Sequence, residues 1–159
     1  MSCGLCCDGT LIGFVEFDSE DIPAMRELMD IETVNENGFF LQPCNKYCEG
    51  CTIYVQRPKQ CTNFKCGLLK SVEQKDLDFD FAVETINMVK QKKSPIEKKL
   101  NTLPFELQSQ SFYFKMVELK KLLKNNKSES SLSQNHLELI SDLKQLDNLL
   151  SSKFDISLS

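Results

Sequence analysis

The chain has 159 residues, of which 41% are hydrophobic and 26% charged, ordinary values for one globular domain or two small ones. Its formal net charge of −4 and the lack of a basic face for phosphates argue against a nucleic-acid partner. No apolar run approaches the ~18 residues of a membrane span. The opening Met-Ser-Cys has neither the basic nor the apolar region of a secretion signal. We therefore expect a cytoplasmic protein with no membrane partner.

The first half of the chain predicts short strands and one short helix. The β-prone segment 10–17 predicts a strand, and apolar residues at helical spacing predict a helix over about 20–29. A turn signal at 35–38 precedes a predicted strand over 39–41. The segment 51–56 is predicted as a further strand. Together these elements predict a small antiparallel sheet.

The second half of the chain is predicted to be helical. The predicted helices cover 67–74, about 79–93, about 102–123 and about 137–150. Pro95 is expected to end the second helix, whereas Pro104 suits the opening turn of the third. The polar segment 124–131 is predicted to be a mobile linker. The fold class is therefore predicted to be α+β, with a cysteine-rich domain over 1–75 and a helical region over 76–159.

All eight cysteines of the chain lie in the predicted cysteine-rich domain. They are Cys3, Cys6, Cys7, Cys44, Cys48, Cys51, Cys61 and Cys66. In a reducing cytoplasm, thiols clustered in this way favour metal binding over disulfides. We expect all eight to be metal ligands.

The spacing of the cysteines is typical of a thiolate metal site. Both Cys3/Cys6 and Cys48/Cys51 have the C-x2-C spacing that supplies two soft ligands from one tight turn. We expect the glycine inside each turn to adopt a positive φ angle. The spacing leaves the metal open: eight sulfurs fit two tetrathiolate zinc sites, and four fit an iron–sulfur cluster.

Arg57 is the basic residue that we expect to contribute to the site. It lies in a local excess of positive charge, which comprises Lys46, Arg57, Lys59 and Lys65 against Glu49. Cations near thiolates lower the pKa of the thiols and offset the charge of the cluster. The proline that follows Arg57 fixes the direction of the loop. We therefore expect Arg57 to anchor the loop through a carboxylate or backbone carbonyls and to favour the thiolates.

Two segments, "SCGLCCDGTLIGFVEF" and "CNKYCEGCTIYVQRPKQCTNFKC", resemble the YkgJ-like cysteine-cluster family, a bacterial-type group of zinc- or iron-chelating proteins. The resemblance covers roughly residues 2–66. It includes, besides the cysteines, Ile53, Tyr54, Arg57, Pro58 and Phe64. The family motif has one more cysteine, which would fall before Met1. The resemblance implies metal chelation but no established shared reaction.

These observations favour a cytoplasmic protein that binds zinc, iron or an iron–sulfur cluster through its cysteines. One alternative is a redox or protein-modifying enzyme that uses the cluster or a thiol such as Cys7, and another is a metal carrier. Cys7 is either a ligand of a second site or, if there is one site, a reactive thiol of lowered pKa. No catalytic motif is present in the sequence. The expected partners are a metal ion and a protein that binds the helical half.

Overall fold

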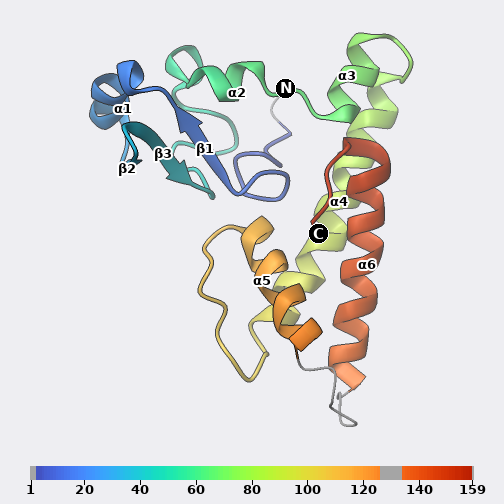
Figure 1. The fold of residues 1–159 in the computed structure, drawn as a ribbon. Coiled ribbons are helices and arrows are strands. Elements are labelled where there is room, and N and C mark those ends of the chain that lie inside the picture. Colours follow the sequence, from blue (N-terminus) through green and yellow to red (C-terminus); the bar gives the residue numbers. More distant parts are fainter. Residues whose placement is uncertain (1–2, 126–133, 159) are drawn as a thin grey trace. The chain divides into compact units, whose positions relative to one another are not determined.

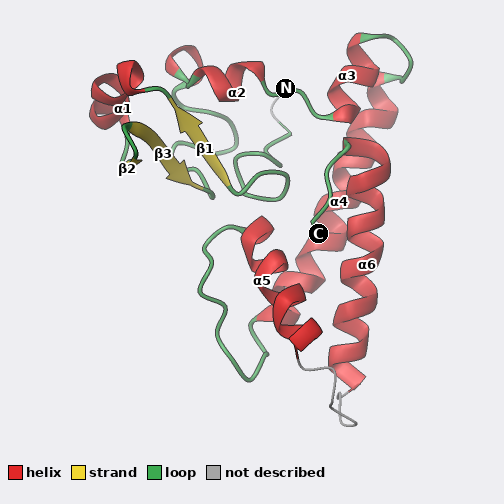
Figure 2. Ribbon diagram, viewed as in Figure 1, coloured by secondary structure: helices red, strands yellow, loops and turns green. Residues whose placement is uncertain are grey.

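The computed structural model describes residues 3–125 and 134–158 and has an α+β fold (Figures 1 and 2), as predicted. Its elements are β1 (Phe14–Phe17), the 3₁₀ helix η1 (Ser19–Asp21), α1 (Ile22–Leu28), β2 (Glu32–Val34), β3 (Asn37–Leu41), the 3₁₀ helix η2 (Tyr54–Gln56), α2 (Lys59–Asn63), α3 (Gly67–Glu73), α4 (Phe79–Leu100), α5 (Phe112–Asn125) and α6 (Gln134–Phe154).

The chain divides into two compact units, which are described separately. Unit 1 comprises Met1–Phe64 and Ser109–Lys115, and unit 2 comprises Lys65–Gln108 and Met116–Ser159. Unit 1 is therefore built from two separate segments of the chain. The domains predicted over 1–75 and 76–159 stay a prediction.

Unit 1 contains a three-stranded antiparallel sheet with the strand order β1-β3-β2. The strands β2 and β3 form a hairpin whose last pair is Val34 and Asn37. The two loop residues, Asn35 and Glu36, have φ angles of 49° and 69°. Positive φ at both loop positions gives the turn the twist that a two-residue hairpin needs. This hairpin confirms the predicted turn over 35–38.

One face of this sheet is covered by the hydrophobic core of unit 1. Val15, Phe17 and Phe40 alternate with exposed or half-buried residues along β1 and β3, and they pack with Met25 and Met29 from the region of α1. The alternation follows from the two-residue period of a strand. Cys44 and Cys61 pack against the same core. The sheet thereby brings two distant cysteines to one place.

Unit 2 is a helical unit in which α4 and α6 run side by side (Figure 1). Lys92 donates to Gln145 (3.0 Å) and Lys99 to Asp142 (2.8 Å), so the two helices are antiparallel. The core of the unit is made of buried apolar side chains at helical spacing: Leu68, Ala82, Val89, Ile96, Met116, Leu119, Leu139, Leu143, Leu146, Leu150, Phe154 and Leu158. The predicted helical character of the second half is confirmed.

The prediction of a strand over 51–56 is wrong. Residues 54–56 form the 3₁₀ helix η2, and the side chain of Val55 is 96% exposed. Thr52 donates to the carbonyl oxygen of Lys46 through both its backbone nitrogen (2.8 Å) and its hydroxyl (2.9 Å). This closed loop bends the chain, and β-branched residues form a strand only where they have a sheet to pack on.

Two predicted helix ends are also wrong. The helix α4 continues through Pro95 to Leu100, because the buried neighbours Lys93 and Ile96 hold both sides of the proline in helical packing. The helix α5 begins at Phe112 and not at 102–104. Its start is set by Ser111, whose hydroxyl accepts the backbone N–H of Phe114 (3.2 Å), as in an N-cap.

Most of the predicted linker 124–131 lies outside the residues that the structure describes. Within residues 3–125 and 134–158, no helix is both long and apolar enough to cross a membrane.

Candidate metal centre

The first cysteines lie in a tight turn near the start of the chain. The backbone N–H of Asp8 donates to the carbonyl oxygen of Gly4 (2.8 Å), and that of Gly9 donates to Cys6 (3.2 Å). The carboxylate of Asp8 accepts the backbone N–H (2.9 Å) and the hydroxyl (2.6 Å) of Thr10. These hydrogen bonds fold Cys3, Cys6 and Cys7 into one compact knot.

Tyr47 packs directly on this knot. Gly4 has a φ angle of +77°, and a Cβ atom built there would lie 2.0 Å from the Tyr47 hydroxyl oxygen. Only glycine combines that φ angle with so close a neighbour at little cost. The predicted positive φ at Gly4 is therefore confirmed, and its cause includes an aromatic residue that the sequence analysis missed. The sequence around Tyr47 carries no signal of this contact, because the contact depends on the distant backbone of Gly4.

The second group of cysteines is tied to the knot by the backbone. The N–H of Cys44 donates to the carbonyl oxygen of Cys7 (2.8 Å). Tyr47, which packs on Gly4, also pairs with Cys51 in an isolated β-bridge. Because Cys44 and Cys61 pack against the same hydrophobic core, cysteines from three separate segments of unit 1 converge.

The converging cysteines change one another's pKa values. Burial and the neighbouring charges of Cys44, Cys51, Cys61 and Cys3 raise the pKa of Cys7 to about 12. Burial, together with Cys44 and Cys51, likewise raises the pKa of Cys61 to about 11. Each thiol disfavours the thiolate of the next, since like charges in a partly buried site repel. A cation among them would reverse this balance.

Two basic residues, Lys46 and Arg57, partly oppose that repulsion. Burial raises the pKa of Cys44, while a hydrogen bond from the backbone of Lys46 and the charge of Lys46 lower it. The charge of Arg57 lowers the pKa of Cys61 against the effect of burial. Both residues come from the basic excess identified in the sequence.

Arg57 is held in a way that differs from the prediction. Its guanidinium carbon lies 3.8 Å from the centroid of the Tyr54 ring, a cation–π contact. Among the described residues, the structure gives Arg57 no hydrogen bond to a carboxylate or a backbone carbonyl. The expected anchor is therefore replaced by stacking on an exposed tyrosine, and the charge remains close enough to act on Cys61.

The structure treats the remaining cysteines differently. Cys48 is exposed, and its N–H donates to the carbonyl oxygen of Gly50 (2.9 Å). The positive φ in this turn belongs to Glu49 (54°) and not to Gly50, so that part of the prediction is wrong. Cys66 lies in unit 2, as the residue before α3.

The described cysteines offer metal-binding chemistry without a formed coordination sphere. All eight lie in the described part of the chain, and none of them is in a disulfide. Within that part, no group of three or more His, Cys, Asp or Glu side chains is arranged to hold a metal ion. The converging sulfur donors fit a soft metal in kind, and binding would have to draw them together.

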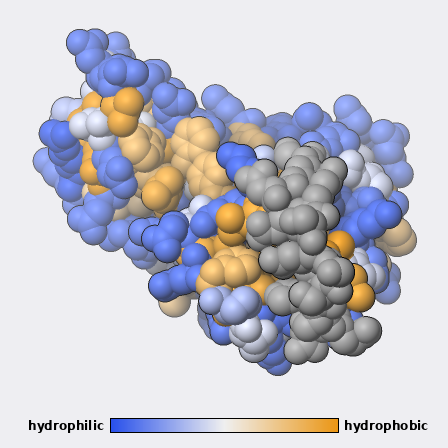
Figure 3. Space-filling view, turned by 60° about the horizontal axis from the view of Figure 1, so that its bottom comes forward, coloured by the Kyte–Doolittle hydropathy of each residue, from blue (hydrophilic) through white to orange (hydrophobic). Residues whose placement is uncertain are grey.

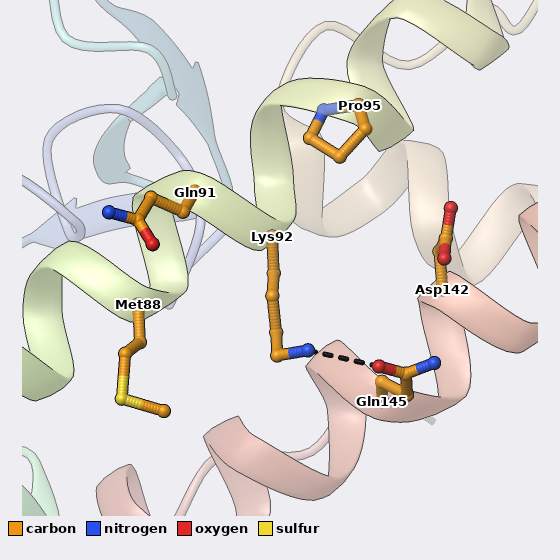
Figure 4. A pocket seen from close by; sticks show the side chains of 6 residues that line it. All are labelled: Met88, Gln91, Lys92, Pro95, Asp142 and Gln145. Atoms are coloured by element: carbon orange, nitrogen blue, oxygen red, sulfur yellow. Dashed lines mark hydrogen bonds between the residues drawn. The ribbon is translucent and has the colours of Figure 1, made fainter.

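A hollow in unit 2 is a weaker candidate site (Figure 4). It has a volume of about 340 Å³ and lies between α4 and α6, lined by Met88, Gln91, Lys92, Pro95, Asp142 and Gln145. Lys92 donates across it to Gln145, and Asp142 pairs with Lys99 at 2.8 Å. Its charged groups are thus already used by the helix pair.

Comparisons of the chain with protein-family models, with curated proteins and with solved structures find no match.

Proposed function

We propose that this chain is a metal-binding protein whose centre lies in unit 1. The observation that carries the proposal is the convergence of cysteines from three segments, 3–7, 44–51 and 61, on one knot and one core. The metal is zinc or iron, the latter as an ion or in an iron–sulfur cluster. The YkgJ-like resemblance of the sequence points to the same chemistry.

The energetic argument for a metal starts from the thiols themselves. Their raised pKa values mean that the protein alone keeps Cys7 and Cys61 protonated near neutral pH. Bringing neutral thiols together contributes little to stability. A bound cation converts them to thiolates and adds its binding free energy to folding, which for structural zinc is on the order of 10 kcal/mol. Unit 1, with its small core, would gain most from this.

The inner ligands of the centre are Cys3, Cys7, Cys44, Cys51 and Cys61, which act on one another electrostatically. Cys6 belongs to the same knot as Cys3 and Cys7. Cys48, in an exposed turn, is the remaining cysteine of unit 1. Cys66, the eighth ligand predicted from the sequence, belongs to unit 2, and its part in the centre stays a prediction. Arg57 and Lys46 supply positive charge beside the sulfurs.

The alternative is a redox or protein-modifying enzyme that uses the cluster or a free thiol such as Cys7, and its thiol-based form needs a reactive thiolate at Cys7. Its surroundings work against one, because burial and four neighbouring thiols raise its pKa. The predicted lowering of that pKa depended on the charge of a bound metal. A protein partner for the helical half stays a prediction.

Anaerobic purification followed by elemental analysis, sulfide determination and a visible spectrum tests the proposal. We expect stoichiometric zinc in a colourless protein, or iron with a visible chromophore, with sulfide present if the iron forms a cluster. Cys7→Ser combined with Cys44→Ser should abolish metal binding. Asn45→Ser introduces the same side chain at an exposed neighbouring position and should leave it unchanged. Full metal content in the double variant would refute the centre.

A further inference from the structure

The face of the unit 1 sheet that points away from the core carries several partly exposed apolar side chains. Because Val15 and Phe17 face the core, Phe14 and Glu16 lie on the opposite side, and the strand register places Leu41 and Phe39 beside them. Phe14 is 41% exposed and Val34 56% exposed. Hydrophobic side chains are visible at the surface among hydrophilic ones in Figure 3. We call the side of the sheet that carries Phe14, Glu16, Phe39 and Leu41 the outer sheet face.

One aromatic residue from the second segment of unit 1 completes the outer sheet face. The ring of Phe114 stacks on Phe14 with centroids 6.2 Å apart and planes 12° apart. It also covers Gly13, where a Cβ atom would lie 2.5 Å from the ring. The result is a shallow pocket of about 400 Å³, lined by Phe14, Glu16, Val34, Asn35, Asn37, Phe39, Leu41 and Phe114.

The two edges of the sheet are not equivalent. On the β1 edge, the backbone N–H of Glu16 donates to the side-chain oxygen of Gln60 in α2. On the β2 edge, the described part of the chain supplies no further strand and no such cap. An edge strand with unsatisfied N–H and C=O groups is a template for another strand. The chain therefore covers one edge itself and leaves the other open.

The hairpin geometry shows which backbone groups are available. A two-residue hairpin loop is closed by a hydrogen-bonded pair, here Val34 and Asn37. The preceding residue, Thr33, therefore directs its N–H and C=O away from β3. All three residues of β2 are exposed. Thr33 is thus the point at which an added strand would pair.

The negative charge around the β2 edge indicates which kind of segment would bind there. Residues 14–41 contain eight acidic residues and one basic residue, Arg26. On the outer sheet face, Glu32 lies two residues from Val34 in β2. A second copy of this chain would bring two strongly acidic edges together, which opposes self-pairing. A basic segment would be attracted instead.

We propose that the β2 edge and the outer sheet face bind an extended segment of a partner protein with a basic-x-apolar pattern. Its backbone pairs with Thr33, its basic side chain lies opposite Glu32, and its apolar side chain packs beside Val34 and over the pocket. This is strand addition, in which the backbone gives affinity and alternate side chains give specificity. The inference rests on the sheet alone and is independent of the metal centre.

The probe for this proposal is a short peptide with the symmetric core Lys-Thr-Val-Thr-Lys, which fits β2 in either direction. Titrated into the ¹⁵N-labelled full chain, the peptide should shift the amide signals of Thr33 and its neighbours. A higher salt concentration should weaken the binding of the peptide. The matched peptide Glu-Thr-Val-Thr-Glu should bind at least about tenfold more weakly, because like charges face Glu32.

Variants of the chain separate the backbone and charge contributions. Thr33→Pro removes the outward N–H and should weaken the lysine peptide about tenfold, whereas Thr33→Val keeps the N–H and should bind like the wild type. Glu32→Lys should reverse the preference between the two peptides. Equal binding by Thr33→Pro and Thr33→Val, or shifts confined to other regions, would overturn the proposal. Concentration-dependent shifts at Thr33 without peptide would assign the edge to a second copy and overturn it as well.

Discussion

The two units of this chain are stabilised by different means. Unit 2 has a continuous apolar core along antiparallel helices, with Val89, Ile96, Leu146 and Leu150 inaccessible to solvent. The hydrophobic cluster beneath the sheet of unit 1 has five buried residues, and Cys44 and Cys61 pack against it. Small cores supply little net stability, and natural proteins supplement them with metals or cross-links. If unit 1 binds metal as proposed, the metal would contribute to the stability of this unit and not to that of unit 2.

Removing the metal should give the largest separation between the units. We expect a strong chelator, under anaerobic reducing conditions, to unfold unit 1 and leave unit 2 folded, since only unit 1 would lose the free energy of metal binding. Limited proteolysis with mass spectrometry should then show new cleavage within 1–64 and continued protection of α4 and α6. Equal protection of 1–64 with and without metal would contradict the comparison.

A core truncation should affect the other unit. Leu146 in α6 is fully buried, and Leu146→Ala should lower the free energy of unfolding of unit 2 by about 2–5 kcal/mol. Thermal or denaturant unfolding measures this, and metal content should stay unchanged. The control Leu69→Ala makes the same change at a side chain that is 42% exposed and should have a much smaller effect. A loss of metal from Leu146→Ala would show that the units do not fold independently.

Acid should weaken unit 2 through Asp147. Burial raises the pKa of this carboxyl, but hydrogen bonds from Lys120 (2.7 Å) and the backbone of Leu158 (2.8 Å) outweigh it, so that the pKa lies below the ordinary 3.8. Because the folded pKa is the lower one, the stabilisation is fully present above the unfolded pKa. It is lost as the pH falls through the folded value.

Asp147→Asn should therefore cost about 1–2 kcal/mol at neutral pH and flatten the acid limb of the stability curve. Denaturant unfolding between pH 3 and 7 checks both effects. The exposed Asp76→Asn serves as the control and should reproduce the wild-type curve. An unchanged pH dependence in Asp147→Asn would remove this carboxylate from the account.

The smallest effect is expected at Arg57. Arg57→Lys keeps the charge but loses the planar group that stacks on Tyr54. Since Tyr54 is 60% exposed, we expect a change of about 0.5–1 kcal/mol, seen as a few-fold faster metal release to a competing chelator. Arg26→Lys, at an exposed position in α1, should release metal like the wild type. Identical release in both variants would leave Arg57 with a charge effect only.

Much of the fold could be predicted from sequence because periodicity is local. The strand periodicity of β1 and the apolar spacing of α4 and α6 each follow from neighbouring residues. The strand predicted over 51–56 failed because Val55 has no sheet to pack on, which is a property of the whole unit. Pro95 failed as a helix end because packing on both sides outweighs one missing hydrogen bond. Ser111 is a typical N-cap residue for α5, but the start of this helix was predicted at Pro104 instead.

The candidate site was predictable in composition but not in arrangement. The spacing of the cysteines named the donors, whereas their grouping depends on Cys44 and Cys61 packing on the same core. Tyr47 could not be assigned from its own sequence context, because its role depends on the backbone of Gly4, more than forty residues away. The stacking of Arg57 depends on the η2 turn that replaced a predicted strand.

The discontinuity of unit 1 has a consequence for synthesis of the chain. Tyr113 donates its N–H to the carbonyl oxygen of Gly9 (2.8 Å), and residues 109–115 belong to unit 1. A ribosome that has completed the last cysteine of unit 1, Cys61, must add about fifty more residues before this covering segment exists, which takes on the order of several seconds. During that interval Gly9 lacks this backbone partner, and if the knot binds metal as proposed, metal and oxidants would compete for its thiols before unit 1 is complete.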